Sequence, residues 1–114
     1  MLGYVWNASV SNLNIYGPQI NGYGLVNNYH GVNMDGTAIE IDNVTLKTGT
    51  QTRKAGLIGA ELNDENGFGG ASAKCTVTIR NCTVEPGVVI GYGKDQSMIG
   101  AIAGRLHGVI ENCK

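Results

Sequence analysis

A pattern centred on an asparagine recurs four times along the 114-residue chain. In each copy, alternating apolar residues lead up to the asparagine and further apolar residues follow it. The copies are ASVSNLNI (8–15), IEIDNVTL (39–46), VTIRNCTV (77–84) and GVIENC (108–113). Their asparagines are Asn12, Asn43, Asn81 and Asn112, spaced by 31, 38 and 31 residues. A unit of this length cannot bury its apolar residues alone, so the copies are expected to stack on one another.

The alternation changes phase at each asparagine. In the third copy, Val77 and Ile79 point to one side of a strand of period two, whereas Cys82 and Val84 are the apolar pair after Asn81. A shift by one residue without a long loop indicates that the chain turns a corner and keeps the same interior. Asparagine suits such a corner because it tolerates left-handed backbone angles and can bond its own backbone.

A second, glycine-rich motif lies between the asparagines, at 24–27 (GLVN), 56–59 (GLIG) and 97–101 (SMIGA). The longer middle spacing is explained by an insert at 63–70 (NDENGFGG), whose composition is typical of a loop. We therefore interpret each unit as two strands that meet at an asparagine corner, followed by a glycine-rich third strand.

Parallel stacking of such three-sided units predicts an all-β fold, a parallel β-helix (solenoid) of about three to four coils with like residues ~4.8 Å apart. The four asparagines would form a ladder along one corner, each side-chain amide bonding the next, and would satisfy buried polar groups that otherwise cost ~1–3 kcal/mol each. A β-sandwich of short strands is the alternative, but it does not explain four phase shifts at the same residue type. Residues 1–114 are thus expected to form a single β-helical repeat domain.

Composition excludes several classes of protein. Charged residues make up only 15% of the chain and glycines number 18, which disfavours a helical protein with charged outer faces. A formal net charge of −1 lacks the basic footprint of a nucleic-acid binder. We expect no membrane span, because no apolar run approaches ~20 residues. Residues 1–6 lack the basic segment of a signal peptide, so none is expected in this segment.

The segments 56–60 (GLIGA), 99–104 (IGAIAG) and 108–113 (GVIENC) resemble the GLUG-type repeat of large bacterial surface and secreted proteins. That repeat typically reads Gly-Gly-Leu-Val-Gly, a gap, and then Gly-x-Ile-x-Asn-Cys. The resemblance implies a pectate-lyase-like right-handed β-helix, which often serves as a stalk or adhesive region. It also implies an extracellular or cell-surface location as part of a larger chain.

The resemblance is strongest over residues 77–114, looser over 37–62 and weak before residue 36. Asn12 and Asn43 depart from the pattern, because Leu and Val follow them instead of Cys. The motif therefore points to an architecture and not to a reaction.

Two cysteines, Cys82 and Cys113, occupy the same repeat position and are expected inside the stack on neighbouring coils. Their Cα separation of ~4.8 Å is compatible with a disulfide, but parallel in-register side chains are poorly aimed for one. Cys75 precedes the corner and makes the count odd. We expect three free thiols that pack as small hydrophobes, and no zinc site, because the chain has no Cys-x-x-Cys pair.

The position before the corner asparagine carries Asp42, Arg80 and Glu111, an acid, a base and an acid in one outer column. Carbohydrate-active β-helix enzymes need such groups, and inverting hydrolases use two carboxylates ~6.5–9.5 Å apart. The favoured interpretation is a surface charge ladder worth ~0–1 kcal/mol per pair. The chain offers no Asp-Asp pair and no Gly-His-Gly triplet that would favour the enzyme.

Other candidate residues have structural explanations. His30 and His107 each precede a glycine and are expected to be solvated turn residues, and the loop 64–67 (DENG) has too few oxygen ligands for calcium. Six aromatic residues could bind sugars, but capping of the stack is favoured. They are Tyr4, Trp6, Tyr16, Tyr23, Tyr29 and Tyr92.

These observations predict a non-catalytic β-helical segment of a bacterial cell-surface or secreted protein, which acts as a rigid spacer or adhesion surface without cofactor or metal. Glycans or host surface molecules are the expected partners. The alternatives are a carbohydrate-active fragment that uses the Asp42, Arg80 and Glu111 face, or a carbohydrate-binding fragment that uses the aromatic residues. A stack under ~20 Å long exposes strand edges, so we expect a piece of a longer chain or end-to-end self-association.

Overall fold

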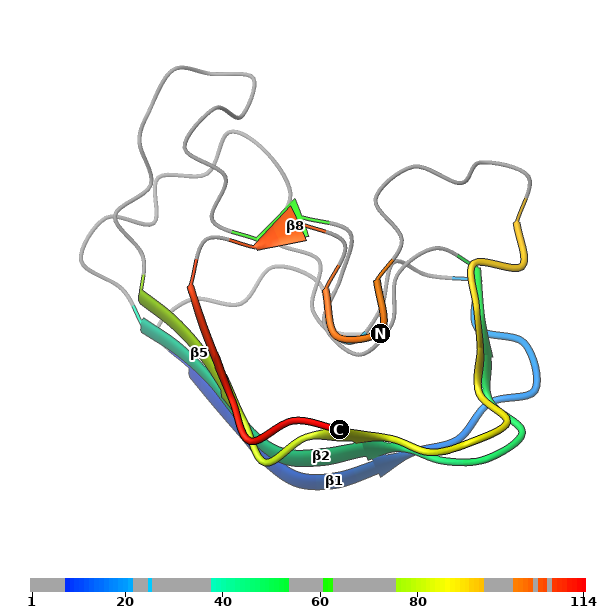
Figure 1. Ribbon diagram of the computed structural model, residues 1–114, viewed down its shortest axis with the longest axis horizontal. Coiled ribbons are helices and arrows are strands. Elements are labelled where there is room, and N and C mark those ends of the chain that lie inside the picture. Colours follow the sequence, from blue (N-terminus) through cyan, green and yellow to red (C-terminus); the bar gives the residue numbers. More distant parts are fainter. Residues whose placement is uncertain are drawn as a thin grey trace.

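The described part of the chain is all-β. The computed structural model describes residues 8–21, 25, 38–53, 61–62, 76–93, 100–103, 105–106 and 108–114. These residues form nine strands and no helix (Figure 1), so none of them belongs to a helix that could cross a membrane. The strands are β1 (Ala8–Ile15), β2 (Ala38–Leu46), β3 (Gln51–Thr52), β4 (Glu61–Leu62), β5 (Thr76–Arg80), β6 (Thr83–Val84), β7 (Val89–Ile90), β8 (Arg105–Leu106) and β9 (Val109–Glu111).

The main sheet has the order β1-β2-β5-β9, and β6 pairs with the end of β2. All of its pairings are parallel. Its register aligns Val10 with Ile41, Ile41 with Ile79, and Ile79 with Ile110. These offsets of 31, 38 and 31 residues equal the spacings of the asparagines. The parallel alignment of the four repeats predicted from the sequence is therefore confirmed, and it differs from the antiparallel pairing of a β-sandwich.

Two short parallel pairs complete the described sheets. β3 pairs with β7, and β4 pairs with β8 on the side of the molecule opposite β1 and β2 (Figure 1). Residues 63–75 separate β4 from β5, whereas only residues 107–108 separate β8 from β9. The insert predicted at 63–70 lies outside the described residues. The bounds of the flanking strands nevertheless make the connection from β4 to β5 longer than the equivalent connection from β8 to β9.

The interior is built by the phase shift at the corner. In β2, Ile39 and Ile41 are buried, Asn43 is exposed, and Val44 and Leu46 are buried. The shift predicted at this asparagine is therefore confirmed, since the inward positions are of one parity before Asn43 and of the other parity after it. A single strand thus lines two adjoining walls of one core.

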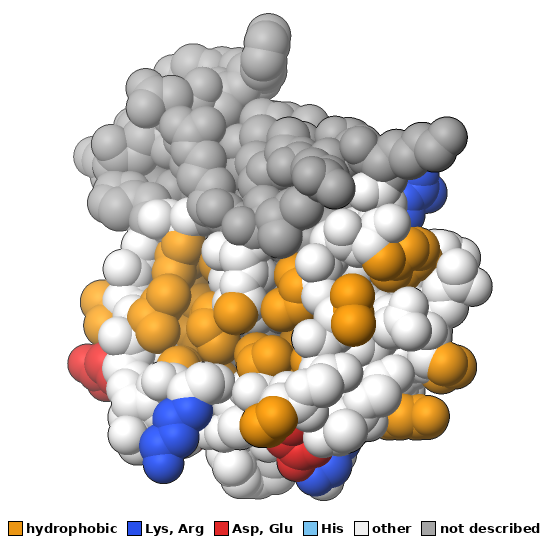
Figure 2. Space-filling view, turned by 45° about the vertical axis from the view of Figure 1, so that its right-hand side comes forward, with side chains coloured by type: hydrophobic (Ala, Val, Ile, Leu, Met, Phe, Trp, Pro, Cys, Tyr) orange, Lys and Arg blue, Asp and Glu red, His pale blue; other side chains and the backbone are white. Residues whose placement is uncertain are grey.

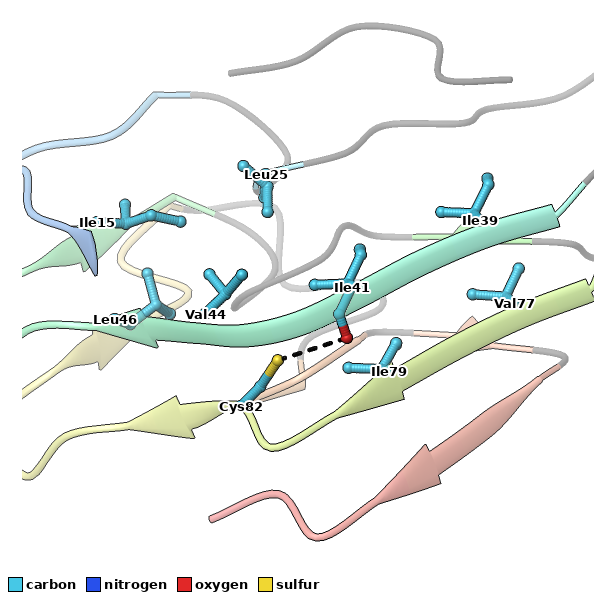
Figure 3. Close-up of a cluster of buried hydrophobic side chains, with 9 residues drawn as sticks. All are labelled: Ile15, Leu25, Ile39, Ile41, Val44, Leu46, Val77, Ile79 and Cys82. Carbon is cyan, nitrogen blue, oxygen red and sulfur yellow. Dashed lines mark hydrogen bonds between the residues drawn. The ribbon is translucent and has the colours of Figure 1, made fainter. Parts of the chain in front are cut away.

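Nine buried hydrophobic side chains form this core. Figure 3 shows that those of β2 and β5 extend to the same side of the main sheet, the side on which Leu25 lies. Burial of each large aliphatic side chain contributes ~1.5–3 kcal/mol. The nine are Ile15, Leu25, Ile39, Ile41, Val44, Leu46, Val77, Ile79 and Cys82.

A second corner, built on glycine, follows the first in two consecutive repeats. Gly49 and Gly87 have φ angles of 88° and 85°, each at the third position of a four-residue turn. The N–H of Thr50 donates to the Lys47 carbonyl at 3.1 Å, and the N–H of Val88 donates to the Glu85 carbonyl at 3.3 Å. A positive φ at the third position is the signature of a type II turn.

Two threonines in the core give a test of polar burial. Thr50 and Thr52 are both fully buried, and the Thr50 hydroxyl lies 3.4 Å from the Ile15 carbonyl. In the described part of the chain the Thr52 hydroxyl has no hydrogen-bond partner. We expect Thr52→Val to raise the free energy of unfolding by about 1 kcal/mol, because the substitution removes an unsatisfied buried hydroxyl.

Urea denaturation of the wild type and of both valine variants measures this effect. Thr50→Val is the matched control, and it should not stabilise the protein, because it removes a hydroxyl that has a partner. Destabilisation by Thr52→Val would show that its hydroxyl is satisfied in solution.

Candidate functional site

The corner asparagines share an unusual backbone conformation. Asn12, Asn43, Asn81 and Asn112 have φ angles of 56°, 53°, 54° and 50°, and no other non-glycine residue of the described chain has a positive φ. This left-handed region costs most residues roughly 1–2 kcal/mol and is tolerated best by glycine, asparagine and aspartate. The repeat asparagines therefore supply the bend that connects the two parts of each unit.

Side-chain amides connect neighbouring corners in two of the three steps. Asn43 Nδ2 donates to Asn12 Oδ1, and Asn112 Nδ2 donates to Asn81 Oδ1, both at 2.8 Å. In the middle step Asn81 Nδ2 donates instead to Asp42 Oδ1, also at 2.8 Å. The expectation that each amide bonds the next is therefore wrong at this step. Only at this step is the asparagine of the earlier repeat preceded by a carboxylate, that of Asp42. A carboxylate accepts a stronger, charge-assisted hydrogen bond than an amide oxygen does.

The four asparagines are exposed, so the expectation that they are buried is wrong. The left-handed bend directs each side chain outward, and the next residue takes the inward position, as Val44 does after Asn43. Since water can reach these amides, a lost bond is not penalised as a buried unsatisfied group. Each amide bond is worth about 0.5–1.5 kcal/mol net.

The outer charge column is only partly joined by ion pairs. Arg80 Nε lies 3.4 Å from Asp42 Oδ2, and Arg80 Nη2 lies 3.6 Å from Glu40 Oε2. Glu111 is aligned with Arg80 in the sheet, but no ion pair joins the two among the described residues. Glu40 was not singled out from the sequence, although its position two residues before Asp42 places it on the same outer face.

Asp42 therefore has a partner at each carboxylate oxygen, Asn81 at one and Arg80 at the other. These groups are all substantially exposed, so such pairs are worth ~0–1 kcal/mol each. The arrangement can anchor the corner and present a mixed charged surface. It leaves the Asp42 carboxylate fully engaged within the protein's own structure.

The two described thiols are stacked as the register requires. Cys82 and Cys113 are free, each two residues beyond the aligned pair Arg80 and Glu111. Cys82 Sγ lies 3.2 Å from the Arg80 carbonyl and 3.9 Å from that of Ile41 (Figure 3), and Cys113 Sγ lies 3.3 Å from the Glu111 carbonyl. Cys82 is fully buried in the core, and this burial raises the pKa of its thiol above its ordinary value of 9.0.

A polar cross-link at the glycine corner was missed from the sequence. The Glu85 carboxylate forms an ion pair with Lys47 and accepts hydrogen bonds from the Thr48 N–H at 2.8 Å and from the Thr48 hydroxyl at 3.1 Å. The hydrogen bond from Lys47, followed by that from Thr48, lowers the pKa of Glu85 below its ordinary value of 4.5. A signal was available, because Lys47 and Glu85 carry opposite charges four residues after successive corner asparagines.

Several residues considered from the sequence lie outside the described residues. They are His30, His107, Cys75, the loop 64–67 and the aromatic residues Tyr4, Trp6, Tyr23 and Tyr29. Of the remaining aromatic residues, Tyr16 is 67% exposed, and the Tyr92 hydroxyl is hydrogen-bonded to Asn21 Oδ1. Within the part of the chain that the structure describes, no three His, Cys, Asp or Glu side chains are grouped to hold a metal ion.

Comparisons with known proteins add no relative to this picture. No protein-family model matches the chain, and searches of curated proteins and of solved structures return no match to it.

The left-handed corner can be tested at Asn81, which both donates and accepts a side-chain bond. We expect Asn81→Ala to lower the free energy of unfolding by about 1 kcal/mol more than Asn81→Gly does, because alanine is strained at φ 54° and glycine is not. The measurement is the urea midpoint of each variant at constant m-value.

Thr83, two residues further along in β6, supplies the control. At this ordinary strand position glycine should be the more destabilising substitution, because it adds backbone entropy without relieving strain. If alanine were tolerated as well as glycine at position 81, the corner would not require a left-handed residue.

The Glu85 cross-link predicts a pH-dependent stability. The pKa of Glu85 is lower in the folded protein, so its contribution is complete above the unfolded pKa near 4.5 and is lost as the pH falls through the folded pKa. We expect Glu85→Gln to lower the melting temperature at neutral pH, and the difference from the wild type to shrink as the pH falls below 4.5. Thermal unfolding monitored across this pH range measures it.

Glu111→Gln is the comparison, since Glu111 makes no ion pair among the described residues. Its effect on the melting temperature should be smaller at neutral pH. An equal effect of the two substitutions would mean that the Glu85 contacts do not stabilise the corner.

Proposed function

We propose that the chain is a right-handed parallel β-helix of about three to four coils with the asparagines along one corner, and that it is a non-catalytic segment of a bacterial cell-surface or secreted protein. The observation that carries this proposal is the register, in which equivalent residues of consecutive repeats are aligned at offsets equal to the repeat spacing. Right-handedness follows from the strong preference of parallel β crossovers. The resemblance of 56–60 and 108–113 to the GLUG-type repeat points to the same architecture.

The role that fits this architecture is a rigid spacer or an adhesion surface. Parallel strands in register place like positions above one another, so the outer faces become regular columns of polar side chains. Thr45 and Thr83 are aligned in one such column, and Asp42 and Arg80 in another. Such a surface is suited to contact glycans or host surface molecules along its length, and of its charged groups Asp42 and Arg80 are already paired with each other.

Glycan binding is favoured as the form of adhesion by one further observation. Tyr16 is 67% exposed, and a Cβ added at Gly49 would lie 3.2 Å from Tyr16 Cε2, so its ring lies close to the backbone of the second corner. An exposed aromatic ring beside a glycine offers an open apolar face to a sugar. A glycan array compared between the wild type and Tyr16→Ala tests this, with binding lost in the variant as the supporting result.

The enzymatic alternative is tested with acidic polysaccharides as substrates. We expect the wild type to release neither unsaturated products, detected by absorbance, nor new reducing ends, because the Asp42 carboxylate is engaged by Asn81 and Arg80. Cleavage by the wild type that disappears in Arg80→Gln would contradict the proposal.

The architecture itself is tested by amide hydrogen exchange on the same protein. Amides of β2 and β5 should be the most protected, since each of these strands has a paired neighbour on both sides, whereas β1 and β9 have one. Equal protection of all four strands in a solution dilute enough to hold monomers would argue against the proposed stack.

A further inference from the structure

The two outermost strands of the main sheet leave inward-facing side chains partly uncovered. In the middle strands, the inward residues Ile41 and Ile79 are 0% exposed. The residue aligned with them in β9, Ile110, is 48% exposed. In β1, Leu13 is 38% exposed, whereas Val44, with which it is aligned, is 0% exposed. Each end of the stack thus presents core residues that lack a covering layer among the described residues.

Several hydrophobic residues of the later repeats pack against the core but remain partly buried, and they are Val84, Val88, Ile102, Ala103, Leu106 and Cys113. Figure 2 shows one face on which hydrophobic side chains gather across the middle, with charged side chains at its lower border. An apolar area with a polar border is typical of a protein–protein contact.

The side-chain amide bonds give the stack a direction. Asn43 donates to Asn12, and Asn112 donates to Asn81, so each bond runs from the later repeat to the earlier one. Asn81 also donates to the earlier repeat, through Asp42. Among the described residues, Asn12 is therefore left with an unused amide donor at one end, and Asn112 with an unused carbonyl acceptor at the other.

The backbone edges have the same complementarity. In the sheet order β1-β2-β5-β9, β1 and β9 each pair with one described strand and have a second edge directed away from the sheet. Because every pairing is parallel, a further strand added to β9 in the same sense would have the orientation of β1. The β1 edge of one copy is thus complementary to the β9 edge of another copy, and two identical edges are not complementary to each other.

From these observations we infer that the protein associates head to tail with further copies of itself, β1 of one copy pairing in parallel with β9 of the next. This inference rests on the proposed β-helix and concerns the chain of residues 1–114 by itself. The register of the sheet then places Asn12 beside Asn112, Val10 beside Ile110 and Leu13 beside Cys113 of the neighbouring copy. The donor of one ladder end meets the acceptor of the other, and apolar residues cover apolar residues.

A second copy is the occupant that the charges favour. In this register Ser11 of one copy faces Glu111 of the next, so a hydroxyl meets a carboxylate, and no like charges are aligned along the Asp42 column. A contact between two different patches is heterologous, and each added copy presents a new free end. The product is an open-ended row of molecules and not a closed dimer.

Sedimentation velocity over a range of protein concentrations tests the inference. We expect the weight-average sedimentation coefficient of the wild type to rise with concentration beyond that of a dimer. Leu13→Lys and Ile110→Lys should each abolish this rise, because each places an unpaired charge in one of the two contact surfaces. Circular dichroism of each variant verifies that it keeps its strand content.

A mixture of the two variants separates head-to-tail association from other modes. Each variant retains one intact end, and the two intact ends are complementary, so an equimolar mixture should form a one-to-one dimer and nothing larger. Val109→Lys is the matched control, since Val109 is adjacent in β9, is 46% exposed and is aligned with Thr78 on the outer face. This control should associate as the wild type does.

Several outcomes would overturn the inference. A wild type that remains monomeric at millimolar concentration would do so, as would a dimer formed by either lysine variant alone, which would indicate contact between identical ends. Should a lysine variant lose its fold, Leu13→Gln and Ile110→Gln repeat the test with milder changes. A monomer whose β2 and β5 amides are protected, and which cleaves no polysaccharide, would refute the stacking inference and leave the proposed function intact.

Discussion

The left-handed turn at asparagine is the constraint on which the described structure depends. A strand of period two directs alternate residues to opposite faces, so a strand that kept this alternation past the corner would turn Val44 and Leu46 outward. One residue at positive φ removes this conflict, because it takes up the extra position and returns the next side chain to the interior. The residue pairs Ile41 with Val44 and Ile79 with Cys82, all buried, are the result.

The same turn also explains the alignment of the sheets. Because each repeat bends at the same point, the walls on both sides of the bend lie over their counterparts, and β2 pairs with β5 before the corner and with β6 after it. The glycine corner continues this alignment, since Lys47 is joined to Glu85 and Thr48 to Pro86 across neighbouring repeats. Local backbone geometry and long-range pairing thus support each other, as expected for a chain with little frustration.

The sequence predicted the features that depend on pattern and missed those that depend on particular partners. The spacing of Asn43 and Asn81 predicted the register, and the phase shift predicted the buried residues of β2. The glycine corner was missed, although Pro86 and Gly87 are the residues that a type II turn favours.

The errors at the asparagine ladder have a different origin. Whether Asn81 bonds another amide or a carboxylate depends on which group is nearer and stronger, and Asp42 decides this. Likewise, the exposure of the ladder depends on the direction in which a left-handed residue points its side chain. Neither property follows from the repeat alone, because each is set by the three-dimensional surroundings of a side chain.

Parallel alignment also restricts which charges an outer column can hold. Like charges directly opposite one another on adjacent strands are destabilising, so a charged residue in one repeat favours an opposite or neutral residue in the next. The column Ser11, Asp42, Arg80 and Glu111 follows this rule at each step, and so does the pair Lys47 and Glu85. This requirement alone explains why the carboxylates of Asp42 and Glu111 are aligned with Arg80. No substrate is needed to explain it. Alternating charges on this face are therefore explained by the parallel alignment of the repeats. They would be evidence of catalysis only if one of the charged groups remained free to react.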